Sequence, residues 1–419
     1  MDTVQEGAAR AAAATRPDGS IDLSATARGL LESLLNAVMD EQASEMASEL
    51  GVARNGYRER SPGTCVGRVT LRVPKLRSGS YFPEEIVSRW SRTDTALASC
   101  VCEMWARGVS TRKVEAVAAE MGLEGMGRSR VSRLCEALDG EVAALRSAPL
   151  WGSEWPYLWL DATYVPCREA GRTGRAALVT AVAASREGAR RVVGLECVDA
   201  ESYLSWRSFL LSLRGRGLAG VELVVSDAHE GLSRAVSEVM LGASWQRCVA
   251  HLERNVADRC RRRGDGAAAA AALKAAFGQS DPALVRVGYA RAAELLREAD
   301  PRAAELLEEA APSALAYLDF PREHRNWIRT NNIQERMNAE IKRRTRVVQV
   351  FPSTESLVRL VGAVCCDQDD AWAAASNFID RRSLARGYEP EALPPATRED
   401  EERVAALVQE GFDRKRRAA

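Results

Sequence analysis

The feature that most constrains this chain is a short apolar run that ends on a carboxylate, at residues 157–164. Its aromatic and aliphatic residues predict a buried strand. Asp161 lies where the apolar run ends. An ionised carboxylate there costs free energy unless a cation or hydrogen bonds compensate. Asp161 is therefore either a cap of the following turn or a metal ligand.

Length and composition leave room for two or three domains, because 419 residues with 46% hydrophobic content can bury substantial cores. Lysine and arginine balance aspartate and glutamate at 58 each, so a polyanionic partner would have to be recognised by local charge. The ten cysteines include no C-x2-C pair, and no secretory signal or membrane-spanning run is evident. We expect a cytoplasmic protein with reduced thiols and no membrane partner.

The N-terminal region combines a helix with a basic segment. Residues 1–20 are small and polar and are expected to be disordered. Leucine spacing predicts a helix from about 30 to 50, ended by Gly51. Residues 67–75 alternate apolar with polar and basic side chains, which predicts a half-exposed strand. Between 51 and 80, seven Arg and Lys face one Glu, so this segment either contacts phosphates or is a solvated loop.

A helix-turn-helix is predicted at about 110–139, within a DNA-binding region at 21–150. Its two short helices, at 110–121 and 128–138, flank a turn that contains glycine. The basic residues are Arg112 and Lys113 on the first helix and Arg128, Arg130 and Arg133 near the start of the second. A basic start on the second helix favours binding of double-stranded DNA, although any helical bundle can contain two such helices.

The second half of the chain predicts an α/β domain. A linker at 147–156 is followed by strands at 157–164, 176–183 and 191–198, a helix at 201–214, a strand at 221–227, a helix at 229–240, a strand at 245–249 and a helix from about 251. A meander followed by βα units indicates an RNase H-like mixed sheet. We place this domain at 151–263 and 320–380, with an all-helical insertion at 264–319. Residues 381–419 are expected to be a C-terminal tail, with a linker at 388–400 followed by a solvated helix that ends in a basic run at 414–417.

Three acidic residues could carry chemistry. Asp161 and Asp227 each end a predicted strand, and Glu335 follows Asn332, which could cap a helix at the spacing of a capping box. Neighbouring strands can bring the aspartates together, and a helix packed on the sheet can add Glu335. Clustered carboxylates stay ionised if they share hard divalent cations such as Mg²⁺ or Mn²⁺. Two ions about 3.5 to 4 Å apart can activate an attacking oxygen and stabilise a leaving oxygen at phosphorus.

Several segments together resemble the Mutator-type transposases of bacterial insertion sequences. They are residues 54–57, 108–114, 160–164, 225–232, 245–251 and 330–348. The resemblance covers roughly 30–380 and implies a DDE domain of RNase H-like fold with a helical insertion before the Glu. By position, Asp161, Asp227 and Glu335 match the family's metal-binding triad. Cys248 and His251 match its C-x2-H motif, and Asn332 matches its Asn three residues before the Glu.

The resemblance implies hydrolysis at transposon ends, followed by attack of the freed 3′-hydroxyl on DNA. The implied partners are the terminal inverted repeats and the target DNA, with a homodimer expected because two ends must be paired. After Glu335 comes a basic run that would bind phosphates beside the metals or form a solvated helix face: Lys342, Arg343, Arg344 and Arg346.

Alternatives remain open. Another RNase H-like nuclease would not need the helix-turn-helix region and the long helical insertion. A catalytically inactive, transposase-derived DNA-binding regulator would not need three buried carboxylates. Zinc is not expected at Cys248 and His251, because a closed site needs four ligands and, beyond Cys260, no second pair is evident. We expect His251 to orient a phosphate or a neighbouring carboxylate instead.

Overall fold

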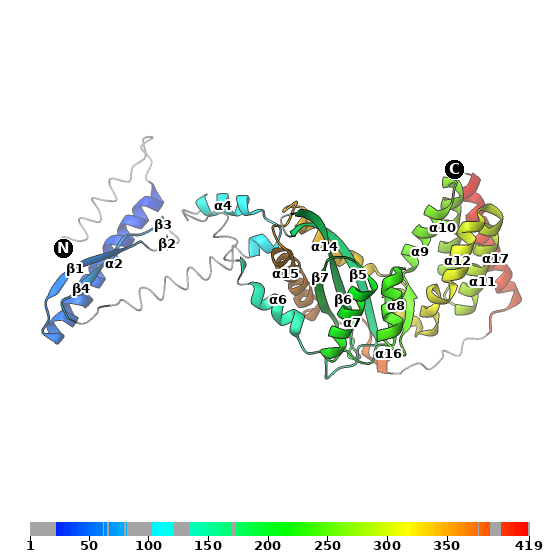
Figure 1. The fold of residues 1–419 in the computed structure, drawn as a ribbon, viewed down its shortest axis with the longest axis horizontal. Helices are drawn as coiled ribbons and strands as arrows, with labels where there is room; N and C mark the ends of the chain where they lie inside the picture. Colours follow the sequence, from blue (N-terminus) through cyan, green and yellow to red (C-terminus); the bar gives the residue numbers. More distant parts are fainter. Residues whose placement is uncertain are drawn as a thin grey trace. The chain divides into compact units, whose positions relative to one another are not determined.

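A computed structural model of the chain describes residues 22–61, 63–64, 67–78, 81, 103–120, 135–136, 138–169, 172–375, 377–385 and 395–417. Two compact units follow one another along the chain, Met1–Asp139 and Gly140–Ala419 (Figure 1). The expected disordered segment at 1–20 lies outside the described residues. So does most of the second helix of the predicted helix-turn-helix, including Arg128, Arg130 and Arg133.

In the first unit a long helix packs on small antiparallel sheets. Helix α2 (Leu23–Leu50) is followed by β1 (Arg54–Arg60), β2 (Gly63–Thr64), β3 (Gly67–Arg68) and β4 (Leu71–Leu76), in which β1 pairs with β4 and β2 with β3. Gly51 ends α2 in the left-handed region with φ 61°, as predicted. Leu71 and Val73 of β4 are buried beside Met39, and Arg72 is exposed, which confirms the half-exposed strand. Helix α4 (Thr111–Glu120) matches the first helix of the predicted pair.

The second unit is built on a five-stranded mixed sheet. Its strands are β5 (Tyr157–Glu169), β6 (Arg172–Ala184), β7 (Arg190–Val198), β8 (Leu223–Ser226) and β9 (Ser244–Arg247), in the order β7-β6-β5-β8-β9. The pairs β7–β6 and β6–β5 are antiparallel, while β5–β8 and β8–β9 are parallel. This is the predicted meander followed by βα units, and it confirms a mixed α/β fold.

Helices cover both faces of this sheet (Figure 1). On one face, Leu158 and Leu160 of β5 share a core with Trp206 of α7 (Tyr203–Gly215) and Val236 of α8 (Glu230–Val239). Because side chains alternate along a strand, Trp159 and Asp161 point to the opposite face. That face is covered by α14 (Asn332–Thr345) and α15 (Thr354–Ala373). Around them lie α6 (Leu138–Ser147), α9 (Val249–Arg259), α13 (Arg322–Ile328) and α16 (Arg381–Ala385).

The segment expected to be a linker, 147–156, instead packs into the second unit. Leu150 and Trp155 are buried in the same core as α7. The amide of Leu150 donates to the carbonyl of Arg216 over 2.7 Å, and the indole of Trp155 donates to the carbonyl of Leu150 over 2.9 Å. The boundary between the units therefore falls at 139/140, because apolar side chains anchor this proline-containing stretch to the sheet domain.

The insertion is all-helical, as expected, and consists of α10 (Arg263–Phe277), α11 (Pro282–Ala299), α12 (Pro301–Ala314) and the 3₁₀ helix η1 (Ala316–Asp319). The C-terminal segment differs from the prediction, since α17 (Arg398–Arg417) packs along α10 and α11 (Figure 1). Its buried residues, Val404, Val408 and Phe412, recur every four residues among charged ones and so form one apolar stripe. The tail therefore completes the helical insertion.

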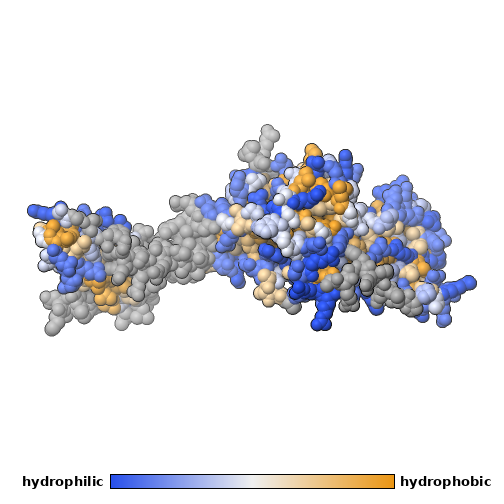
Figure 2. Space-filling model, turned by 90° about the horizontal axis from the view of Figure 1, so that it is seen from below, coloured by the Kyte–Doolittle hydropathy of each residue, from blue (hydrophilic) through white to orange (hydrophobic). Residues whose placement is uncertain are grey.

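The face seen in Figure 2 carries hydrophilic and hydrophobic residues side by side. Exposed apolar side chains include Trp151, Leu204 and Leu241. None of the helices that the structure describes has the length and apolar character to cross a membrane.

Candidate active site

Asp161 of β5 and Asp227, which directly follows β8, occupy equivalent places relative to the pairing of the two strands. Asp161 lies inside β5 and not at its end, which differs from the prediction. However, the parallel pairing of β5 with β8 stops at Trp159 and Val225, and each aspartate follows two residues later. Adjacent strands lie about 4.8 Å apart. The two aspartates are therefore side by side where β5 and β8 part.

Asp161 is held by two hydrogen bonds and surrounded by negative charge. Its Oδ1 accepts from the amide of Ala162 over 2.9 Å, and its Oδ2 accepts from Nδ2 of Asn338 over 2.8 Å. Burial, together with the charge of Asp227, raises the pKa of Asp161 to about 7, and the charges of Glu201 and Glu335 act in the same direction. Three other carboxylates thus act on Asp161.

Buried amides fix the start of α14 to the sheet. Asn331 Nδ2 donates to the carbonyl of Leu160 over 3.0 Å, and Gln334 Nε2 donates to the carbonyl of Trp159 over 2.9 Å. Thr180 of β6 donates to Oε1 of Gln334 over 3.0 Å. Because hydrogen bonds are directional, these contacts fix both the position and the rotation of α14. Glu335 follows Gln334 directly, so the same contacts fix where it lies.

Glu335 faces two basic side chains of α9. Its Oε1 lies 3.8 Å from Nε2 of His251 and 3.5 Å from a guanidinium nitrogen of Arg254, which is three residues further along the same helix. This oxygen is buried and has no hydrogen-bond partner among the described residues. Asn338 lies three residues after Glu335 and therefore on the same face of α14. One helix thus presents Glu335 to α9 and Asn338 to Asp161.

The predicted capping box at Asn332 is wrong. Asn331 occupies the N-cap position of α14, Asn332 is the first helical residue and is exposed, and no side chain caps the helix. The side-chain amide of Asn331 donates to a carbonyl of β5, and the side chain of Glu335 faces α9. The buried asparagine at this helix start is therefore Asn331.

Cys248 serves as a buried structural contact. It occupies the N-cap position of α9, and its Sγ accepts a hydrogen bond from the amide of Asn331 over 3.2 Å. Burial raises the pKa of the thiol. A neutral thiol in this position joins the starts of α9 and α14, which carry His251 and Glu335.

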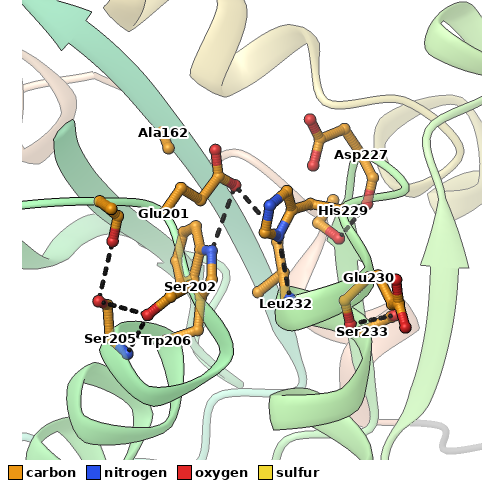
Figure 3. Close-up of polar contacts among 12 residues, drawn as sticks. Ala162, Glu201, Ser202, Ser205, Trp206, Asp227, His229, Glu230, Leu232 and Ser233 are labelled. Atoms are coloured by element: carbon orange, nitrogen blue, oxygen red, sulfur yellow. Dashed lines mark hydrogen bonds and ion pairs between the residues drawn. The ribbon is translucent and has the colours of Figure 1, made fainter. Parts of the chain in front are cut away.

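Two residues of the site were not selected from the sequence. Asn338 could have been found from its three-residue spacing to Glu335, which predicts a shared helix face. Glu201 follows β7 closely and precedes α7, in the same kind of strand-to-helix connection as Asp227 (Figure 3). Its influence on Asp161 places it in this acidic region.

The donor set suits a hard cation, although its geometry is open. In the part of the chain that the structure describes, no three His, Cys, Asp or Glu side chains are grouped so as to hold a metal ion. Even so, Asp161, Asp227 and Glu335 offer carboxylate oxygens, and the buried Oε1 of Glu335 makes no hydrogen bond within the described part of the chain. Mutual repulsion at Asp161 would be relieved by a divalent cation. The residues therefore fit such an ion in chemistry and charge.

A family model described as "Transposase, Mutator family" matches residues 2–375. The chain belongs to the Mutator family of transposases. It is 35% identical over 367 residues to the transposase for insertion sequence element IS1081 of Mycobacterium tuberculosis, covering 86% of this chain and 88% of the relative. It is 36% identical over 375 residues to the transposase for ISRM5 of Rhizobium meliloti, covering 88% and 92%. These matches confirm the resemblance inferred from the sequence motifs.

The transposase for IS256 in transposon Tn4001 of Staphylococcus aureus is 32% identical over 359 residues, covering 83% of this chain and 91% of the relative. A solved structure titled "Drosophila P element transposase strand transfer complex" aligns with 81% of this chain and 94% of its own, at 12% identity and a TM-score of 0.28. That likeness is too low to support an argument.

The basic run of this transposase divides into exposed and buried residues. Lys342, Arg343 and Arg346 are exposed near the end of α14, whereas Arg344 is buried. Arg344 pairs with Glu340 over 2.7 Å and with Asp367 of α15 over 2.9 Å. We therefore correct the assignment of Arg344 to DNA binding, because its guanidinium joins α14 to α15. On α4 of the first unit, Arg112 and Lys113 are exposed.

Proposed function

We propose that this chain is a DDE transposase with an RNase H-like catalytic domain. It binds double-stranded DNA at the terminal inverted repeats of its insertion sequence, cleaves strands there and joins them to target DNA. The observation that carries this proposal is that Asp161 and Asp227 each follow the last paired residues of the parallel strands β5 and β8 by two positions, with α14 anchored to β5 by buried amides. The membership of the transposase family supports the same activity.

Asp161, Asp227 and Glu335 would hold two Mg²⁺ or Mn²⁺ ions. When bound, such ions supply an activated attacking oxygen and stabilise the leaving oxygen at phosphorus. Oε1 of Glu335 makes no hydrogen bond among the described residues, and burial together with the charge of Asp227 raises the pKa of Asp161, so both carboxylates favour cation binding. Asn338 orients the carboxylate of Asp161, while His251 and Arg254 hold Glu335 until DNA and ions arrive.

Phosphate contacts would come from exposed basic residues in both units. We assign them to Arg112, Lys113, Lys342, Arg343 and Arg346, which are exposed, and to Arg128, Arg130 and Arg133 of the predicted helix-turn-helix. Such contacts position the duplex and make affinity depend on salt. A homodimer would allow two transposon ends to be held together.

The test is cleavage of labelled terminal-repeat DNA by the Asp227→Asn and Asp161→Asn variants. We expect each to bind the ends like the unchanged protein while cleavage with Mg²⁺ falls by at least about a thousandfold, the scale seen when one member of a catalytic group is removed. Asp319→Asn is the matched control, because Asp319 is 72% exposed and pairs only with Arg286 among the ion pairs described.

Cleavage at an unchanged rate in Asp227→Asn would remove that residue from the site. If the unchanged protein bound the ends but cut with neither Mg²⁺ nor Mn²⁺, a DNA-binding regulator would be the better description.

A further inference from the structure

Glu201 is held by three side chains in the connection between β7 and α7 (Figure 3). Its Oε1 accepts a hydrogen bond from the indole of Trp206 over 3.2 Å and lies 3.7 Å from Nδ1 of His229. Its Oε2 accepts a hydrogen bond from the hydroxyl of Tyr164 over 3.5 Å. The side chain is 11% exposed. Trp206 is fully buried, so the carboxylate is anchored to the core of the sheet domain.

His229 connects this carboxylate to the loop that carries Asp227. It lies two residues after Asp227 and occupies the N-cap position of α8, where its Nδ1 accepts from the amide of Leu232 over 3.3 Å. The position of the imidazole is thus set by α8 and by Glu201, which both contact Nδ1 (Figure 3). Because only Ala228 lies between Asp227 and His229, a displacement of His229 would also move the backbone at Asp227.

The two connections are also packed backbone against backbone. A Cβ atom added at Gly231 would lie 2.6 Å from the amide nitrogen of Tyr203 and 3.1 Å from the carbonyl carbon of Ser202. Real Cβ atoms do not approach backbone so closely, so the first turn of α8 packs on the segment that follows Glu201 without space for a side chain. Burial and the charge of Asp227 raise the pKa of Glu201, which is further evidence that the two carboxylates are close.

We propose that Glu201 is a positioning residue of the active site, which holds His229 and thereby fixes the loop that presents Asp227 to Asp161. This inference rests on the proposed function. It assigns to Glu201 an action on the β8–α8 loop through His229. Residues that orient metal ligands in this way commonly change metal affinity or activity by about 10- to 100-fold when they are removed.

The experiment compares Glu201→Ala with Glu201→Gln. The Gln side chain can place its amide oxygen where Oε1 accepts from Trp206 and faces His229, and its amide nitrogen can donate to the hydroxyl of Tyr164, so it keeps these contacts without the charge. We expect Glu201→Ala to lose about 10- to 100-fold in cleavage rate and to require more Mg²⁺ for half-maximal cleavage, whereas Glu201→Gln recovers most of both. A second measurement without turnover is the rise in melting temperature on adding Mn²⁺, which should be smaller in Glu201→Ala.

Gly231→Ala disturbs the same loop from its other side and keeps the test informative if Glu201→Ala does not fold. It should reproduce the higher Mg²⁺ requirement. Glu238→Gln is the control, because Glu238 also joins α7 to α8, through Tyr203 and Arg207, but does so away from the loop. It should behave like the unchanged protein.

Equal losses in Glu201→Gln and Glu201→Ala would overturn the positioning role, since only the former keeps the contacts. Wild-type cleavage and Mg²⁺ dependence in a folded Glu201→Ala or Gly231→Ala would overturn it as well. If Asp227→Asn loses cleavage while these variants do not, only this inference fails. If Asp227→Asn still cleaves, the proposed function itself fails.

Discussion

The catalytic sheet and the helical insertion are held together by different kinds of contact. Helix α14 is attached to β5 and β6 through the buried amides of Asn331 and Gln334, which bond to backbone carbonyls. Helix α17 is attached to α10 and α11 through a stripe of buried apolar side chains that ends at Phe412. In the insertion, small residues let helices approach closely, as where Gly288 faces Ala276 of α10.

This difference separates positioning from stability. A side-chain hydrogen bond adds little net free energy but fixes direction, so it suits a helix that must present Glu335 at a set place. Apolar burial contributes more free energy and tolerates small shifts, so it suits a helix that completes a bundle. Substitutions that disturb α14 should therefore reduce activity more than stability. Substitutions in the apolar stripe of α17 should reduce stability more than activity.

The largest expected effect on stability is that of Phe412→Ala. Phe412 is 2% exposed, and removing a buried phenylalanine costs about 3–5 kcal/mol of unfolding free energy. We expect a markedly lower melting temperature, measured by calorimetry, with cleavage unchanged well below it. Leu407→Ala on the same helix is the control, because Leu407 is 46% exposed. Loss of cleavage in the folded Phe412→Ala protein would show that α17 contributes to activity as well as to stability.

A smaller effect on the free energy of unfolding is expected from protonation of His324 of α13. His324 is 1% exposed, with Nδ1 2.6 Å from the hydroxyl of Tyr157 and Nε2 2.7 Å from that of Ser383. Burial lowers its pKa, and the charges of Glu323 and Asp380 oppose this shift. The unfolded chain takes up its proton near pH 6.5, before the folded protein does, so stability falls as the pH drops below that value.

We expect the melting temperature of the unchanged protein to fall between pH 7.5 and 5.5 by more than that of His324→Gln, because Gln does not titrate. The measurement is thermal unfolding at both pH values. An identical pH dependence in the two proteins would show that His324 does not contribute to it.

The smallest effect is expected within the basic run of α14. Lys342→Gln should weaken DNA binding a few-fold and reduce the slope of log affinity against log salt by about one, as for loss of one phosphate contact. Arg344→Gln should leave that slope unchanged and lower the melting temperature, because Arg344 pairs with Glu340 and Asp367. Binding titrations at several salt concentrations would decide. A reduced slope in Arg344→Gln would return that residue to the DNA-binding face.

The order of strands and helices in the sheet domain could be predicted from the sequence, because apolar periodicity is a local property. The same local signals predicted the helical insertion and indicated Asp161, Asp227 and Glu335 as one group. Strand boundaries were less accurate, since β5 continues to Glu169, well past Asp161. The role of Arg344 could not be predicted, because a charged residue looks the same in sequence whether it faces solvent or an acidic partner.

By itself, the sequence determined the mixed α/β fold and the family, because both follow from periodicity and from motifs contained in short segments. Only the tertiary structure decided that Asn331 and not Asn332 is buried at the start of α14, that Glu201 joins the acidic region, and that α17 completes the insertion. These outcomes depend on contacts between segments far apart in the chain. Local sequence states which side chains seek burial or a partner, and the packing of distant elements decides which partner each one meets.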